Sequence, residues 1–200
     1  FIGAVRSTLP MGMGLSSSAA LEVATALAVG VRGSATEVAT LCQRAEQRAS
    51  GVPCGVMDQL TSLAGVEGHA VLIDCTNLTV TPIELPEQVE VVVVDSGEPR
   101  TLAGSGYAER RAQCEAAAAL IGPLATATLD QVESLEDEVL RRRARHVVTE
   151  NARVLGFVNA IGAGDLDEAG RLMVASHASL RDDFEVSTPG LDEMVAGLAG

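Results

Sequence analysis

The order of apolar and polar residues predicts a chain that is mostly helical. Residues 16–31 are nearly all apolar, with Glu22 as the one charge, and this pattern predicts a buried helix. A second helix is predicted from Thr36 to about Ser50, because its apolar side chains share one face and its arginines another. A short third helix is predicted over residues 59–64, with Asp58 at its start.

Two apolar runs predict strands, at residues 71–73 and 90–94. The second is rich in valine, which is typical of a strand buried on both faces. Pro82 and Pro86 interrupt the connection between them, and we place a domain boundary near residue 88. The remainder is predicted to be helical at residues 107–121, 136–161, 166–179 and from 191 onward.

A run of acidic residues at 133–138 precedes Arg141, Arg142 and Arg143. Opposite charges three or four positions apart on a helix form pairs on its surface. We therefore expect this segment to be a solvated helix face rather than a phosphate site.

A glycine-rich loop leads into the first predicted helix. It consists of Gly12, Met13, Gly14, Leu15, Ser16, Ser17 and Ser18. The first N–H groups of a helix have no partner within it, and the helix dipole is positive at that end. Glycines let a ligand approach the backbone closely, and serine hydroxyls can cap a helix, bind phosphate or reach a metal. The spacing alone leaves two interpretations open, an anion-binding loop and an ordinary capped helix.

Composition narrows the chemistry further. The chain has 200 residues and a formal net charge of -13, which argues against a nucleic-acid partner. All 14 basic residues are arginines. The lack of lysine excludes a Walker-type phosphate lysine and a lysine base or Schiff base. Any phosphate must be bound by backbone amides, hydroxyls, arginine or a metal ion.

The four cysteines, at positions 42, 54, 75 and 114, form no Cys-x-x-Cys pair and lie apart from the histidines. This pattern indicates reduced thiols in the cytoplasm rather than a zinc site or a disulfide framework. No apolar span is long enough for a membrane helix, and we expect a monomer without membrane partners. Because the chain starts at Phe1 and stops within a predicted helix, we expect it to be a fragment of a longer protein.

Several segments resemble the GHMP small-molecule kinases. The stretch Leu9–Ala20 resembles their phosphate-binding motif, with the triple serine found in galactokinases, and Gly51–Gln59 is similar to the galactokinase sugar-site segment. Further similar segments follow in order at residues 68–75, 107–115, 143–148 and 179–187. The resemblance implies the α+β two-domain GHMP fold, incomplete in this chain. Its N-terminal part is like domain 2 of ribosomal protein S5, and its C-terminal part is α/β. Residues 1–88 would belong to the N-terminal, ATP-binding domain and residues 89–200 to the C-terminal domain.

The resemblance also implies a phosphate and metal site. In the family, the loop wraps the phosphates of ATP, and Ser18 and Glu46 match the two Mg²⁺ ligands. Their chemistry fits, because Mg²⁺ accepts hydroxyl oxygens and prefers at least one carboxylate. From the sequence alone, Glu46 could equally be an exposed helix residue.

For the acceptor sugar, the resemblance implies roles for Gly55, Asp58 and Tyr107. Asp58 matches the catalytic aspartate and also contacts the sugar in this reading, although an aspartate at a helix start is also stabilised by the dipole. Gly55 removes a side chain where a sugar could approach, and the neighbouring Cys54 would line the pocket. Tyr107 could present its ring face and its hydroxyl to a sugar. Alternatively, it could simply pack between the two domains.

The implied activity is transfer of the γ-phosphoryl group of MgATP to the C1 hydroxyl of α-D-galactose. A kinase for a related sugar, such as arabinose or N-acetylgalactosamine, and a non-catalytic galactose- and ATP-binding regulator stay open. Relatives that act as sensors can lack the Ser-Ala pair that Ser18 and Ala19 form here, and this favours an enzyme. The family's early Glu-His-Asp motif with its arginine, and its late glycine-rich motif, do not occur in the chain. We therefore expect no turnover from residues 1–200 alone.

Overall fold

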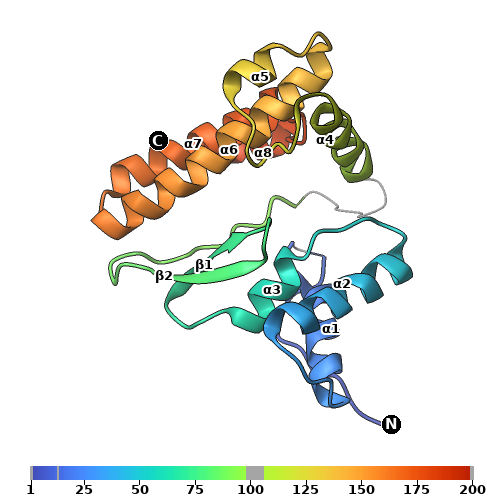
Figure 1. Ribbon diagram of the computed structural model, residues 1–200. Helices are drawn as coiled ribbons and strands as arrows, with labels where there is room; N and C mark the ends of the chain where they lie inside the picture. Colours follow the sequence, from blue (N-terminus) through green and yellow to red (C-terminus); the bar gives the residue numbers. More distant parts are fainter. Residues whose placement is uncertain (1, 13, 98–105, 199–200) are drawn as a thin grey trace. The chain divides into compact units, whose positions relative to one another are not determined.

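The computed structural model describes residues 2–12, 14–97 and 106–198. They form two compact units, one of residues up to Glu84 and one built mainly of the helices after Gly106 (Figure 1). The domain boundary near residue 88 stays a prediction.

The first unit combines three helices with a two-stranded hairpin (Figure 1). The helices pack on one another, and the third also contacts the first strand. The elements are α1 (Ser17–Ala28), α2 (Ala35–Ser50), α3 (Met57–Ala64), β1 (His69–Asp74) and β2 (Thr79–Glu84). The strands run antiparallel, with His69 opposite Glu84.

Local signals define both ends of α2. Ser34 Oγ accepts from the Glu37 N–H at 3.3 Å, and Glu37 Oε2 accepts from the Ser34 N–H at 2.7 Å, which is a capping box. At the other end, Gly51 adopts φ +71°, a left-handed conformation that glycine reaches without strain. The prediction of this helix from the sequence is confirmed to within one residue at its start.

The core of the first unit lies between α1, α2 and α3. Its buried side chains are Val23, Val38, Ala39, Cys42, Val56 and Leu60. The prediction that the first helix is buried was wrong, because Leu21 and Leu27 are about half exposed. The helix packs on α2 and α3 along one side, and an all-apolar sequence does not say which sides are covered.

The strand predictions succeeded once and failed twice. Residues 71–73 lie in β1 as predicted. The strand β2 was not predicted, because Pro82 indicates a break in the sequence. Pro82 instead pairs with Val71 in a two-stranded ladder, where a proline can face the open edge. The predicted buried strand at residues 90–94 was wrong: Val91 to Val94 are 51–73% exposed and lie in no strand of the part that the structure describes.

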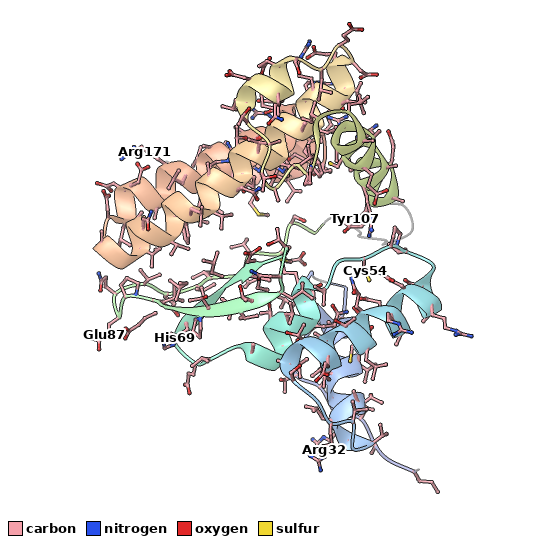
Figure 2. The ribbon with its side chains drawn as sticks, viewed as in Figure 1. Arg32, Cys54, His69, Glu87, Tyr107 and Arg171 are labelled. Carbon is pink, nitrogen blue, oxygen red and sulfur yellow. The ribbon has the colours of Figure 1, made fainter. Side chains whose placement is uncertain are left out.

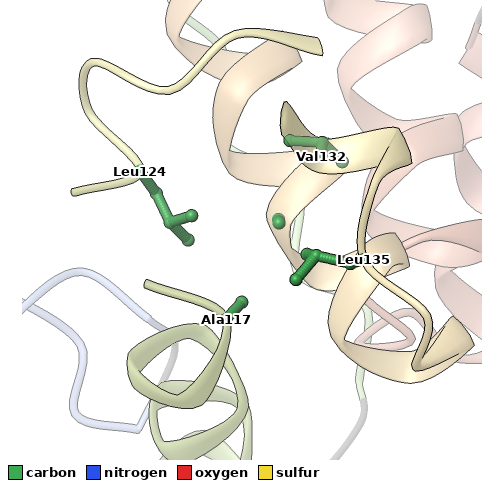
Figure 3. Packing of buried hydrophobic residues seen from close by; sticks show 5 residues of the cluster. Ala117, Leu124, Val132 and Leu135 are labelled. Atoms are coloured by element: carbon green, nitrogen blue, oxygen red, sulfur yellow. The ribbon is translucent and has the colours of Figure 1, made fainter. Parts of the chain in front are cut away.

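The second unit is helical (Figure 1). Its elements are α4 (Tyr107–Ile121), α5 (Leu129–Glu133), α6 (Glu138–Ala163), α7 (Leu166–Asp182) and α8 (Pro189–Leu198). The four longer helices are confirmed to within three residues at each resolved end, whereas the short α5 was not predicted. A cluster of Ala117, Leu124, Val132, Leu135 and Ala144 forms its core (Figure 3). Across the described ranges, no helix has the length and apolar character that a membrane span requires.

Arg143 corrects the prediction of a solvated arginine face. Its side chain is only 2% exposed, and its Nε donates to Gln113 Oε1 at 2.8 Å while its guanidinium pairs with the Glu185 carboxylate. Arg142 Nη1 donates to the other Glu185 oxygen at 2.7 Å. Because these partners lie 30 to 43 residues away in sequence, charge patterning along the helix could not reveal them.

This network predicts acid-sensitive stability. The bonds from Arg143 and then Arg142 lower the pKa of Glu185 to about 2, against about 4.3 in an unfolded chain. The ionised carboxylate therefore stabilises the fold above pH ~4.3, and this contribution is lost as the pH falls towards 2.

We expect Glu185→Gln in the full-length protein to lower the melting temperature at pH 7, and the difference from the unmodified protein to shrink below pH ~4.3. Thermal unfolding followed by circular dichroism from pH 7 to pH 3 measures this. Glu115→Gln is the matched control, because the pair that Glu115 forms with Arg111 on α4 is exposed. An equal loss at every pH would contradict the role of the Glu185 charge.

Candidate functional site

The loop before α1 has an unusual backbone. Gly12, Gly14 and Ser16 have φ values of +79°, +74° and +51°, all in the left-handed region. Glycine adopts this region readily, but a serine there is strained, and such strain commonly marks functional loops. Ser16 is the N-cap of α1, yet its side chain accepts no hydrogen bond from the first turn. The N–H groups at this helix start are thus left for another acceptor, as in an anion site.

The structure describes six of the seven predicted loop residues, and these six differ in exposure. Met13 lies outside the described residues. Leu15, Ser16 and Ser17 are half-buried, whereas Gly12, Gly14 and Ser18 are exposed. The exposed members could meet a ligand without rearrangement of the core.

The structure brings Ser18 and Glu46 together, although they are 28 positions apart. Ser18 Oγ on α1 donates to Glu46 Oε1 on α2 at 2.8 Å. A hydroxyl and a carboxylate at this separation fit Mg²⁺, which binds oxygen and usually takes one or two carboxylates plus water and phosphate. In the described part of the chain, no group of three or more His, Cys, Asp or Glu side chains could hold a metal ion.

The second oxygen of Glu46 is held from the other side. Glu46 Oε2 accepts from Gln59 Nε2 at 2.8 Å and from Cys54 Sγ at 3.2 Å. Gln59, on α3, is fully buried, and its Nε2 also donates to Glu22 Oε2 on α1 at 3.0 Å. One amide therefore connects carboxylates from two other helices.

Negative charge is concentrated around this amide. Burial raises the pKa of Glu22, and the charges of Glu46 and Asp58 raise it further, against the opposing effect of the bond from Gln59. Burial, followed by the bond to Glu46, raises the pKa of Cys54 to about 12. Cys54 therefore stays a neutral thiol at pH 7 and acts as a hydrogen-bond donor, not as a nucleophile.

Asp58 occupies the second position of α3 and is half-buried. The helix dipole there favours a negative charge. The segment that leads into α3 is fixed from α2, because Gln43 and Gln47 donate to the Cys54 carbonyl oxygen at 3.0 and 2.9 Å; Cys54 is labelled in Figure 2. Gly55, next in the chain, is exposed. Asp58 is thus placed by a tethered turn and lies close enough to influence Glu22.

Tyr107 is the first residue of α4, in the second unit, and is 43% exposed (Figure 2). Its ring is available for a ligand within that unit. The predicted contact with a sugar is an expectation that the structure of either unit does not test.

Sequence reasoning missed what Glu22 and Gln59 do. The sequence did contain a signal for Glu22, because it is the one charged residue in an apolar helix. Gln59 gave no signal, because its two partners lie 13 and 37 residues away.

Comparison with known proteins places these residues in a family context. Residues 3–66 match the GHMP kinases N terminal domain. The chain is 47% identical to the galactokinase of Roseiflexus sp. strain RS-1, over 96% of this chain and 52% of that protein. It is 44% identical to the galactokinase of Chloroflexus aurantiacus, over 96% of this chain and 53% of that protein. The chain spans about half the length of the curated relatives it matches.

A solved structure supports the same relationship. The crystal structure of Lactococcus lactis galactokinase complexed with galactose matches with a TM-score of 0.81 and 32% identity, covering 94% of this chain and 53% of that one. The predicted fold class, the α+β GHMP kinase fold, is thereby confirmed.

Proposed function

We propose that the full-length protein is a galactokinase of the GHMP kinase family, which transfers the γ-phosphoryl group of MgATP to the C1 hydroxyl of α-D-galactose. The match of residues 3–66 to the GHMP kinases N terminal domain and the 47% identity to a galactokinase support this proposal. The observation that carries the proposal is the contact of Ser18 with Glu46, beside a loop whose helix N-terminus is uncapped. Phosphoryl transfer needs this combination of a phosphate cradle and oxygen ligands for a divalent cation.

In this proposal, the loop of residues 12–18 binds the nucleotide phosphates through backbone N–H groups and serine hydroxyls. The uncapped start of α1 supports this role, since free N–H groups and the positive dipole both favour an anion. Without lysine in the chain, these neutral donors would carry most of the phosphate contacts available here.

Ser18 and Glu46 would hold the Mg²⁺ ion. When bound, Mg²⁺ neutralises the charge that develops on the phosphate oxygens. The protein's contribution is to present one hydroxyl and one carboxylate oxygen side by side, at a separation already set by the packing of α1 on α2.

Asp58 would accept the proton of the sugar hydroxyl or orient that hydroxyl for attack. Its place at the start of α3 supports this, because the tethered turn fixes the backbone on its N-terminal side. Gly55 would leave room for the sugar. Tyr107, at the start of α4, is proposed as a sugar-binding residue because its ring and hydroxyl suit a sugar. We further propose that residues 1–88 belong to the ATP-binding domain and residues 89–200 to the C-terminal domain.

We also propose that the enzyme works as a cytoplasmic monomer, with ATP and galactose as its small-molecule partners. The four cysteines support a reducing compartment, because all are free thiols. The acidic net charge of -13 supports the absence of a nucleic-acid partner.

The sugar can be tested by initial rates of ADP formation with purified full-length protein. We expect kcat/KM for galactose to exceed that for arabinose and N-acetylgalactosamine by at least about tenfold, since a site that pairs sugar hydroxyls discriminates strongly against altered ones. A higher value for another sugar would identify a related-sugar kinase. Galactose binding without ADP formation would support the regulator instead.

A further inference from the structure

Gln59 is a buried amide at the centre of the carboxylate cluster. Its side chain has no exposed surface, and its Nε2 uses both hydrogens, one on Glu46 Oε2 and one on Glu22 Oε2. In the described residues, Gln59 Oε1 is buried without a partner. An unpaired buried oxygen is costly, so the two bonds from Nε2 decide how the amide is oriented.

These bonds make the two oxygens of Glu46 unequal. Oε2 receives Gln59 Nε2 and Cys54 Sγ, which use its lone pairs. Among the bonds found, Oε1 accepts only from the Ser18 hydroxyl. Ser18 is exposed, whereas Glu46 is half-buried. If the Ser18 hydroxyl keeps its hydrogen but turns it away from Glu46, a cation in its place would meet Oε1 and Ser18 Oγ together.

The choice of an amide is also consistent with cation binding. An arginine between Glu22 and Glu46 would hold both carboxylates but would cancel the negative charge that attracts a metal. An amide donates two hydrogens while it remains neutral, so it adds no positive charge to the site. Groups that orient a metal ligand in this way commonly affect metal affinity strongly.

We propose that Gln59 is a positioning residue for Glu46, and that its amide decides which carboxylate oxygen Glu46 presents with Ser18 to the divalent cation. The proposal rests on the proposed function, because it needs Glu46 to be a metal ligand. Gln59 itself touches neither the metal nor the substrate.

The test uses the full-length protein with Gln59→Met, which keeps the length of the side chain and removes the donor. Mn²⁺ binding in the presence of ADP is measured by electron paramagnetic resonance, without sugar or turnover. We expect the dissociation constant for Mn²⁺ to rise roughly ten- to a hundredfold. The Mg²⁺ concentration for half-maximal activity should rise in parallel, while kcat at saturating Mg²⁺ stays within a few fold.

Gln131→Met is the matched control, because Gln131 on α5 bonds to Thr128 and to the Ile121 carbonyl oxygen and not to a carboxylate of the cluster. It should leave Mn²⁺ binding unchanged. Gln59→Asn, whose amide is too short to span both carboxylates, should weaken Mn²⁺ binding in the same direction and serves if Gln59→Met does not fold. A lower melting temperature with unchanged Mn²⁺ affinity would overturn the proposal. Gln59 would then only stabilise the packing of the three helices. Failure of the unmodified protein to bind Mn²⁺ with ADP would instead contradict the proposed function.

Discussion

Asp58→Asn in the full-length protein is expected to lower kcat by roughly two to four orders of magnitude while galactose still binds. Asparagine keeps the shape and the hydrogen-bonding reach of aspartate but cannot accept a proton. If the transition state is loose, the proton leaves late and the benefit of Asp58 is mainly one of position, which places the loss towards the lower end of this range.

The surroundings of Asp58 leave few alternatives for this role. The chain has no lysine, and Glu46 is engaged by Ser18, Gln59 and Cys54. Substitution should not unfold the protein, because it removes one of the negative charges that crowd Glu22. The lost interaction with the helix dipole costs only about 0.5 kcal/mol.

The measurement pairs kcat with a calorimetric dissociation constant for galactose and a melting temperature for the same variant. A kcat close to that of the unmodified protein would eliminate Asp58 as the base. Loss of activity together with loss of folding would show that Asp58 mainly stabilises the start of α3.

Glu46→Gln is expected to lower kcat/KM at limiting Mg²⁺ by at least about a hundredfold. Losing a group that merely holds a metal ligand costs about 10–100-fold in metal affinity, and losing the ligand's charge should cost more. The new amide would also place its NH₂ group against a donor that the carboxylate accepted from. This donor would be either the Ser18 hydroxyl or the Gln59 amide with the Cys54 thiol. Added Mg²⁺ should recover part of the activity.

Glu22→Gln provides the comparison for Glu46→Gln. Glu22 also accepts from Gln59 Nε2, and a glutamine oxygen at position 22 can still accept this bond, whereas the Ser18 hydroxyl donates to Glu46. Titration of activity with Mg²⁺ should give a large shift for Glu46→Gln and little change for Glu22→Gln. An unchanged Mg²⁺ dependence for Glu46→Gln would show that Glu46 is an ordinary helix residue.

Local signals in the sequence were enough to predict most of the helices. The capping box of Ser34 and Glu37 and the glycine at position 51 define α2 without any tertiary information. Strands were harder, because a strand depends on its partner. The valine run at residues 90–94 had the composition of a buried strand, but it forms no ladder in the structure as described.

In the candidate site, too, local features could be predicted from the sequence and long-range contacts could not. The spacing of glycine and serine marked residues 12–18 as a candidate anion-binding loop, since these features are local, and the family resemblance favoured this interpretation over an ordinary capped helix. The pairing of Ser18 with Glu46 was inferred from family resemblance, and the structure places the two side chains in contact. Gln59 could not be found from the sequence, because its role comes from the packing of α1, α2 and α3 around one amide.

The most direct test of the proposed galactokinase activity is the identity of the product. Full-length protein is incubated with MgATP and galactose carrying ¹³C at C1, and the mixture is followed by ³¹P and ¹³C nuclear magnetic resonance. The account predicts a phosphate monoester whose phosphorus is coupled to the labelled C1, formed in equal amount to ADP. Inorganic phosphate as the only new phosphorus species, or a phosphate ester without coupling to C1, would contradict it.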